Sequence, residues 1–240
     1  MNSNQSGAAV DSLIETKLSF AKKKTIVPVY AILLVLALLY LFPIFWLLLS
    51  AFKPNQEILK VPVAFFPSRF TLENIRRVMI EFSFTRYFAN SLFVTLTTLC
   101  LNVFTSCIIG YVFAKFNFRA KNLIFVFLLG TLMIPFTVTM IPTYQIMIWL
   151  DWLDTYTALI VPAILHTFGI FFHRQYIMSI PDDLLDAARI AGAGEYGIFI
   201  RIIFPLAKPA MATIGITAFF GIWDALLWPL IIHELRPFTN

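Results

Sequence analysis

The chain alternates between long apolar runs and short segments that hold most of its charge. Three runs that lack Asp, Glu, Lys and Arg, residues 25–52, 87–114 and 122–150, exceed the roughly 20 residues that a helix needs to cross a bilayer. A fourth, residues 155–173, is just long enough, and a fifth, about 205–233, is apolar from Pro209 onward except for Asp224. Backbone groups in lipid must bond within their own segment, so each run is expected to form a helix.

The pattern predicts an all-α fold, a polytopic transmembrane helix bundle with five spans. A polar tail over residues 1–24 precedes a transmembrane domain over residues 25–240. Composition agrees, because 60% of the residues are hydrophobic and only 13% are charged, whereas soluble domains carry about 25% charge. The net charge of +5 is explained by basic cytoplasmic loops, so nucleic acid is not an expected partner.

The short loops set the orientation of the bundle. The segment KFNFRAK (115–121) holds three bases and no acid, whereas DWLD (151–154) holds two acids and no base. Basic loops stay in the cytoplasm, so the N-terminus is predicted to be cytoplasmic. The loop 51–86 argues against this orientation, because it would place six bases on the outside. It is long, however, and contains FTLENIRRVMIEFSF, which predicts a short amphipathic helix along the outer surface.

A charged, Ala- and Gly-rich segment, about 179–205, interrupts the apolar runs and is predicted to be cytoplasmic. Its first part predicts a helix over 182–191. Ser179 and Asp182 have the spacing of a capping box, and Pro181 suits a helix start. Gly192 suits the left-handed residue that ends a helix.

The predicted helix has an unusual apolar face. Leu184, Ala187, Ala188 and Ala191 follow the i, i+3, i+4, i+7 spacing, and Asp186 and Arg189 lie three residues apart on a more polar neighbouring face. Small side chains allow close approach of another backbone. Two interpretations therefore stand side by side: the helix docks into a partner, or it rests on the protein's own bundle or the lipid headgroups.

The same segment resembles a known family. DAARIAGAGEYGIFIRIIFP is similar to the EAA motif of ABC transporter permease subunits, and the residues at the matching offsets are Asp186, Ala187, Ala188, Gly192, Ile202 and Pro205. The resemblance continues through FFHRQYIMSIPDDLLDAARIAGA upstream and PLAKPAMATIGITAFFGIWDALLWPLII downstream. Those stretches look like the carbohydrate-uptake permeases, in particular the maltose-type second permease.

The resemblance implies a non-catalytic subunit of an ATP-driven sugar importer in the bacterial plasma (inner) membrane. This chain would form half of the pore, and a second permease subunit would form the other half. A cytoplasmic ATPase dimer would bind ATP and Mg²⁺ and receive the loop helix 182–191, while this chain itself would hold no cofactor. An extracytoplasmic solute-binding protein would deliver the sugar.

The chain departs from the family pattern at several places. Asp186 stands for the usual Glu, Ala191 for a frequent Asp, and Phe204 for the usual Leu. The family core has six spans and this sequence predicts five, so the chain is expected to be truncated before the last transmembrane helix, with HELRPFTN as the start of the last outer loop. A non-functional truncated permease is the corresponding alternative.

Few other residues suggest chemistry. Asp224 is the one acid inside a predicted span, where it either lines the pathway or its gate or lies near the outer boundary. His166 and His173 lack the spacing and carboxylates of a metal pair, so no metal site is expected, and His173 beside Arg174 is expected at the membrane interface. A secondary transporter driven by an ion gradient is the remaining alternative, although it needs several intramembrane charges.

Overall fold

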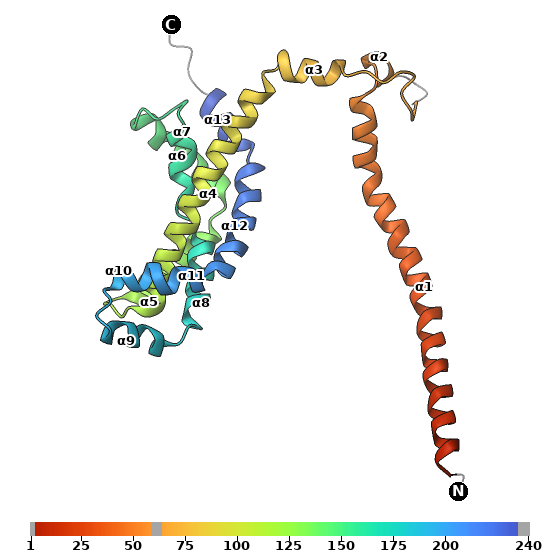
Figure 1. Cartoon of the computed structure of the whole chain (residues 1–240). Coiled ribbons are helices and arrows are strands. Elements are labelled where there is room, and N and C mark those ends of the chain that lie inside the picture. The colour runs from red at the N-terminus through yellow and green to blue at the C-terminus, as the bar shows by residue number, and fades with distance from the viewer. Residues whose placement is uncertain (1–2, 59–63, 235–240) are drawn as a thin grey trace. The chain divides into compact units, whose positions relative to one another are not determined.

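The computed structural model describes residues 3–58 and 64–234, and every element in these ranges is a helix (Figure 1). The chain divides into two compact units, an N-terminal unit (Met1–Thr85) and a C-terminal unit (Arg86–Asn240). The tail HELRPFTN, predicted to begin the last outer loop, lies mostly in residues 235–240, outside the described residues. The all-α fold class predicted from the hydrophobic pattern is confirmed.

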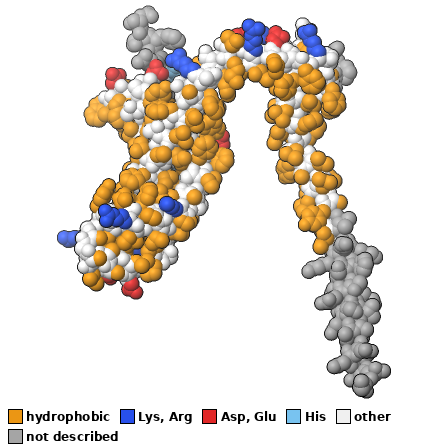
Figure 2. Space-filling model, viewed as in Figure 1, with side chains coloured by type: hydrophobic (Ala, Val, Ile, Leu, Met, Phe, Trp, Pro, Cys, Tyr) orange, Lys and Arg blue, Asp and Glu red, His pale blue; other side chains and the backbone are white. Residues whose placement is uncertain are grey.

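The N-terminal unit is built around α1 (Ser3–Ala51). The part from Pro28 to Ala51 has a mean hydropathy of 2.8, and none of its most apolar stretch is buried within the chain. An apolar surface of this kind has to be covered by lipid or by other protein. Figure 2 shows hydrophobic side chains along the described part of this helix.

The segment after α1 folds back on the helix end around Lys53. This side chain is only 1% exposed, its Nζ donates to Ala64 O at 2.6 Å, and Nζ lies 3.9 Å from the centre of the Trp46 ring. Asn74, in α3 (Glu73–Ile80), donates to Ala51 O and Lys53 O. A four-residue helix, α2 (Asn55–Ile58), lies between them in sequence. The short helix expected in FTLENIRRVMIEFSF is therefore present.

The C-terminal unit holds the rest of the elements. They are α4 (Phe84–Lys115), α5 (Lys121–Gly130), η1 (Thr131–Met133), α6 (Phe136–Trp149), α7 (Tyr156–Ile160), η2 (Val161–Ala163), α8 (Thr167–Met178), α9 (Asp182–Ile190), α10 (Glu195–Ile198), the π-helical η3 (Phe199–Ile203), α11 (Phe204–Leu206), α12 (Lys208–Trp223) and α13 (Leu227–Glu234). In Figure 1, α9 and α10 lie at one end of α4, and α7 and α13 lie at the other.

Two of the predicted spans, 122–150 and 155–173, are bent pairs of helices, and a third bend lies at the start of the predicted span 205–233, which corrects the expectation of one straight helix per run. The bends are 102° between Lys121–Met133 and Phe136–Trp149, 40° between Tyr156–Ala163 and Thr167–Met178, and 71° between Glu195–Leu206 and Lys208–Trp223. The described residues thus hold two straight helices able to span a membrane, or up to five spans if each bent pair counts as one.

Proline explains the sharpest bend. Pro135 has no N–H to donate, and the residue before it, Ile134, is extended with φ −91° and ψ 114°. A residue before proline is pushed out of the helical region, so the helix ends there and α6 begins afresh.

The central helix α4 has the reverse of a soluble helix's polarity. Its buried side is small and polar, and Thr98, Asn102, Ser106 and Gly110 recur every four residues along it. Its exposed side chains are large and apolar, among them Leu92, Phe93, Leu96, Leu101 and Phe104. Small and polar residues at helix interfaces are typical of membrane bundles, because lipid solvates the apolar side.

Polar side chains of α4 bond backbone carbonyl groups that a break in a neighbouring segment leaves without helical partners. Between η2 and α8 the helix is interrupted, and two carbonyl groups lose their helical donors. Asn102 Nδ2 donates to Ala163 O at 3.1 Å, and Thr105 Oγ1 donates to Ile164 O at 3.1 Å. A broken helix at membrane depth is tolerated when neighbouring side chains bond the freed backbone groups in this way.

Other polar atoms on α4 and on or next to α8 are buried without a partner. In the described part of the chain these are Thr98 Oγ1, Asn102 Oδ1, Ser106 Oγ, His166 Nδ1 and His173 Nε2. An unsatisfied buried donor or acceptor costs about 1–3 kcal/mol. His173 is fully buried inside the bundle, because α8 continues to Met178. Its expected depth at the membrane interface stays a prediction.

An apolar cluster secures the end of the unit that holds α9 and α10. Its buried members are Cys107, Tyr111, Ile177, Ile180, Leu185, Ile198, Phe199, Ile203 and Ala207, from α4, α8 and the segment 180–207. The charged segment is therefore packed on the bundle and not a free loop.

Replacement of Gly110 by Ala is expected to destabilise the unit, because the added Cβ would lie 2.7 Å from His173 Cβ and 2.9 Å from the backbone N of Arg174. Overpacking of this kind costs about 1–3 kcal/mol. The measurement is the thermal unfolding midpoint of the purified protein in detergent. Gly130→Ala is the matched control, because no atom lies within 4 Å of its added Cβ; equal midpoints for the two variants would contradict the close approach.

Candidate functional site

The candidate site is the segment from Ser179 to Pro205, which links α8 to α12. The expected capping box at its start is wrong. Ser179 is the C-cap of α8 and its hydroxyl donates back to Tyr176 O at 2.7 Å, so it is not available to α9. The N-cap of α9 is Pro181, and Asp182 and Asp183 occupy the first turn, where negative charge is favoured.

The end of α9 follows the prediction closely. Gly192 has φ +85°, in the left-handed region where a side chain is strained. Its N–H donates to Arg189 O, and the N–H of Ala193 donates to Ala188 O, both at 2.9 Å. These two bonds form a Schellman motif, and Ala188 and Ala193, at its two ends, each pack against the apolar cluster.

The α9 helix has one anchored face and one open face. Leu185 is 1% exposed and belongs to the apolar cluster. Ile190 is 89% exposed and Leu184 is 48% exposed, and Ala187 and Ala191 beside them are exposed as well. The helix thus rests on its own bundle through Leu185 and presents apolar side chains outward. Docking of that outward face into a partner stays a prediction.

A lysine on α4 holds the start of α9. Lys115, the last residue of α4, donates through Nζ to Ile180 O at 2.5 Å and to Asp182 Oδ1 at 2.7 Å. The Lys115 side chain is 6% exposed, whereas that of Asp182 is 73% exposed. The hydrogen bond from Lys115, and then the positive charge of Lys115, lower the pKa of the Asp182 carboxyl from its ordinary value.

A second polar contact holds the end of α9. Arg189 donates to Glu195 Oε1 at 2.8 Å and to Asp186 Oδ1 at 2.7 Å. Glu195 Oε2 in turn accepts from the Tyr111 hydroxyl of α4 at 3.0 Å. The Asp186–Arg189 contact agrees with the predicted spacing. Both ends of α9 are therefore tied to the same end of α4, through residues four apart on that helix.

The six motif residues are placed differently from one another. Asp186, Ala187, Gly192 and Pro205 are exposed, whereas Ala188 and Ile202 are half-buried against the apolar cluster. Sequence reasoning missed Tyr111, Lys115 and Glu195 as members of the site. Lys115 lies 67 residues before Asp182, and Tyr111 lies 84 residues before Glu195, so no local pattern reports these pairs.

Asp224 lies far along the chain from this segment, at the end of α12. It is exposed and forms the C-cap, with its N–H donating to Phe220 O. The helix stops here and α13 begins at Leu227, so the predicted span 205–233 is not continuous. Asp224 is consequently not an acid in the middle of a helix.

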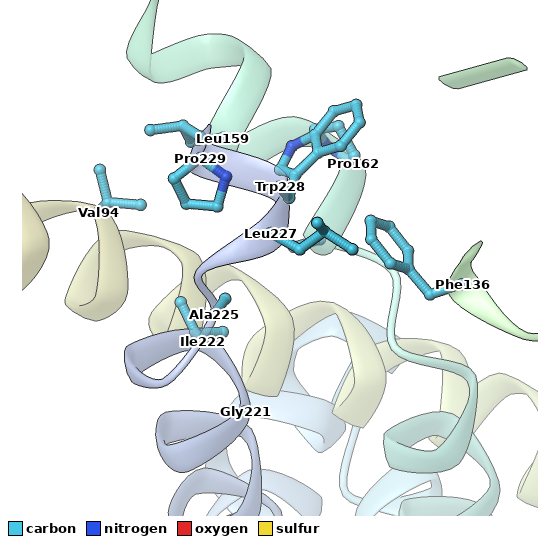
Figure 3. A pocket seen from close by; sticks show the side chains of 11 residues that line it. Val94, Phe136, Leu159, Pro162, Gly221, Ile222, Ala225, Leu227, Trp228 and Pro229 are labelled. Atoms are coloured by element: carbon cyan, nitrogen blue, oxygen red, sulfur yellow. The ribbon is translucent and has the colours of Figure 1, made fainter. Parts of the chain in front are cut away.

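An apolar pocket of about 400 Å³ adjoins this break (Figure 3). Trp228 and Pro229 of α13, Phe136 of α6 and Val94 of α4 line it, together with Ile222 and Ala225 on either side of Asp224. Asp224 itself is not among the lining residues. Over the residues that the structure describes, no group of three or more His, Cys, Asp or Glu side chains is arranged to hold a metal ion.

Comparison with known proteins identifies similar chains. Residues 106–234 match the family described as "Binding-protein-dependent transport system inner membrane component". The arabinooligosaccharides transport system permease protein AraQ of Bacillus subtilis is 41% identical over 202 residues, which cover 83% of this chain and 72% of AraQ. The sn-glycerol-3-phosphate transport system permease protein UgpE of Pectobacterium atrosepticum is 31% identical over 209 residues, covering 85% of this chain and 74% of UgpE.

A solved structure also has a similar fold. It is described as the crystal structure of a bacterial ABC transporter involved in the import of the acidic polysaccharide alginate. The similarity has a TM-score of 0.77 at 25% identity and covers 85% of this chain and 73% of that chain.

Replacement of Tyr111 by Phe is expected to loosen the end of α9, because it removes the hydrogen bond to Glu195. Net hydrogen bonds contribute roughly 0.5–1.5 kcal/mol, which corresponds to amide exchange about 2- to 10-fold faster at Gly192 and Ala193. Hydrogen–deuterium exchange of the peptide that contains them is the measurement. Tyr196→Phe is the control, since Tyr196 is 80% exposed. Identical exchange in the two variants would contradict the tie to α4.

Proposed function

Because the chain belongs to the family of binding-protein-dependent transport system inner membrane components, we propose that it is the permease subunit of an ATP-driven importer for a sugar or sugar-like solute. The observation that carries the proposal is the tethered helix α9 with its open apolar face, at the position of the family's motif. Together with a second permease subunit, the chain would enclose the pathway, each contributing half.

The relatives' names support the solute class. They are permeases for arabinooligosaccharides, sn-glycerol-3-phosphate and diacetylchitobiose, and the similar solved structure imports alginate. These solutes share a short carbon skeleton, or repeats of one, covered with hydroxyl or related polar groups. We take this shared chemistry as the solute class, delivered by an extracytoplasmic solute-binding protein as the family description implies.

The distribution of charge supports a cytoplasmic location for α9 in a bacterial inner membrane. Lys115, Arg119, Lys121 and Arg174 belong to elements that meet at the end of the unit where α9 lies, as the Lys115–Asp182 and Arg174–Phe113 contacts demonstrate. Asp151 and Asp154 lie in the loop between α6 and α7 at the other end. Basic residues gather on the cytoplasmic side of membrane proteins.

The open face of α9 is suited to a cytoplasmic ATPase subunit that binds ATP and Mg²⁺. Ile190 and Leu184 would enter an apolar groove, as an amphipathic helix does in helix-in-groove recognition. When the ATPase dimer closes, the force on α9 would pass through Lys115, Glu195 and the buried Leu185 to α4 and α8. The helix is held at both ends and at its middle, so it would move with the bundle instead of bending away from it.

Replacement of Ile190 by Glu is expected to abolish co-purification of the ATPase. The side chain is 89% exposed, so the variant leaves the bundle's own packing intact while it places a charge in the proposed interface, which is costly when unpaired. The measurement is the amount of ATPase retained on an affinity-tagged permease. Ile190→Leu is the control and should retain it. Full retention by Ile190→Glu would overturn the docking of this face.

Asp224 is proposed to face the solute pathway or its outer gate, because an exposed acid at a helix break can accept hydrogen bonds from solute hydroxyl groups. Asp224→Asn is expected to lower solute uptake in membrane vesicles while the ATPase still co-purifies. Asp151→Asn, another exposed acid at the same end of the bundle, is the control and should leave uptake unchanged. Uptake equal to that of the unmodified protein in Asp224→Asn would remove Asp224 from the pathway.

A further inference from the structure

The helix α3 has an apolar face that nothing in the described part of the chain covers. Ile75, Val78 and Met79 follow the i, i+3, i+4 spacing of one helix face, and they are 37%, 42% and 46% exposed. No residue of α3 is buried. The opposite face is charged, and there Arg77 Nε lies 3.1 Å from Glu81 Oε2 with both side chains exposed. The helix is therefore amphipathic, with an open apolar side.

Two contacts attach the start of α3 to the end of the long helix α1. Thr71, just before α3, donates its N–H to Phe52 O at 2.9 Å. Asn74 Nδ2 donates to Ala51 O at 3.2 Å and to Lys53 O at 2.7 Å. Ala51 is the last residue of α1. The first turn of α3 is therefore held at the end of α1.

The length of α1 places that end at the membrane surface. The part of α1 that is able to cross a membrane, Pro28–Ala51, has 24 residues, which gives about 36 Å at 1.5 Å per residue. The hydrocarbon core of a bilayer is about 30 Å thick, so this helix ends near the boundary between acyl chains and headgroups. Only three residues, 81–83, separate α3 from α4, the next candidate span. Both ends of α3 are thus joined to helices able to cross the membrane.

We propose that α3 lies in the membrane interface, with Ile75, Val78 and Met79 in contact with the acyl chains of the leaflet in which α1 ends. In the predicted orientation this is the outer leaflet. An amphipathic helix at an interface buries its apolar face about 5–10 Å into the boundary between headgroups and acyl chains. Arg77 and Glu81, on the opposite face, then stay in water, where their charges remain hydrated.

Continuity with the surface of α1 favours lipid over a protein partner. None of the most apolar stretch of α1 is buried within the chain. Phe66, Phe70 and Leu72, in the segment that leads into α3, are 71%, 73% and 65% exposed, so the apolar surface continues up to α3. Three exposed side chains of a short helix offer much less than the roughly 800 Å² that each partner buries in a specific protein interface. A lipid surface needs no such area, because it covers any apolar side chain that lies at its level.

The interaction has a mechanical consequence for α1. A shift of α1 along the membrane normal would either pull Ile75, Val78 and Met79 out of the acyl chains or draw Arg77 and Glu81 into them. Both movements are unfavourable, so α3 would hold α1 at one depth. This contact is separate from the proposed contacts with solute and ATPase, and its failure would leave those proposals untouched.

Spin labels on the two faces of α3 test the proposal. Met79→Cys and Glu73→Cys are each labelled with a nitroxide in a Cys100→Ser background, because Cys100 is exposed whereas Cys107 is buried. Glu73 is exposed and lies on the charged side of the helix, so it is the matched control. The full-length chain is placed in lipid nanodiscs together with any subunits that co-purify. Electron paramagnetic resonance then measures the access of oxygen, which concentrates in lipid, and of a water-soluble nickel chelate.

The two labels are expected to give opposite results. The label at position 79 should meet oxygen more often than the nickel chelate, and the label at position 73 should show the reverse. Ile75→Cys should repeat the result of Met79→Cys and decides the test if the latter variant does not fold. Access of the nickel chelate to position 79 as great as to position 73 would overturn the proposal, because the apolar face would then lie in water. Exclusion of both reagents from position 79 would also overturn it, because protein would then cover this face.

Discussion

The structure depends on one constraint, that a backbone surrounded by lipid must find its hydrogen-bond partners within the protein. The chain breaks three of its candidate spans and therefore frees carbonyl groups at membrane depth. Asn102 and Thr105 of α4 donate to the carbonyls of Ala163 and Ile164 at one of these breaks. The polar row along α4 is thus what makes a bent neighbour possible, and the bent neighbour is what brings α8 to the start of α9.

The same helix connects this interior to the surface segment that we propose as the docking site. Lys115 holds the beginning of α9, and Tyr111 holds its end through Glu195. Between the two, Leu185 is buried in the apolar cluster. Salt bridges with an exposed partner contribute little to stability, but here the polar contacts fix the position of a helix whose outward face is apolar. Position, more than stability, is what a coupling element requires.

Much of the fold and part of the candidate site could be predicted from the sequence, because these features depend on residues close together in the chain. Runs of apolar residues predicted the helices, Gly192 predicted the helix stop, and the three-residue spacing predicted the Asp186–Arg189 contact. The predictions that were wrong or missing also have physical causes. Ser179 was assigned to the start of α9, but the end of α8 uses its hydroxyl. The bend at Pro135 was missed because prolines within membrane helices do not always break them. The contacts of Tyr111 and Lys115 join residues that are distant in the chain, so they follow only from the fold.

The spacing of the two attachment points on α4 limits how this protein can change. Tyr111 and Lys115 lie four residues apart, so they share one face of the helix at its last turn. Substitutions can alter either contact alone. An insertion or deletion of one residue between them would turn one side chain about 100° away from the other. The α9 helix would then lose one of its two polar contacts with α4. The length of this turn is therefore more constraining for the position of α9 than the identity of either residue.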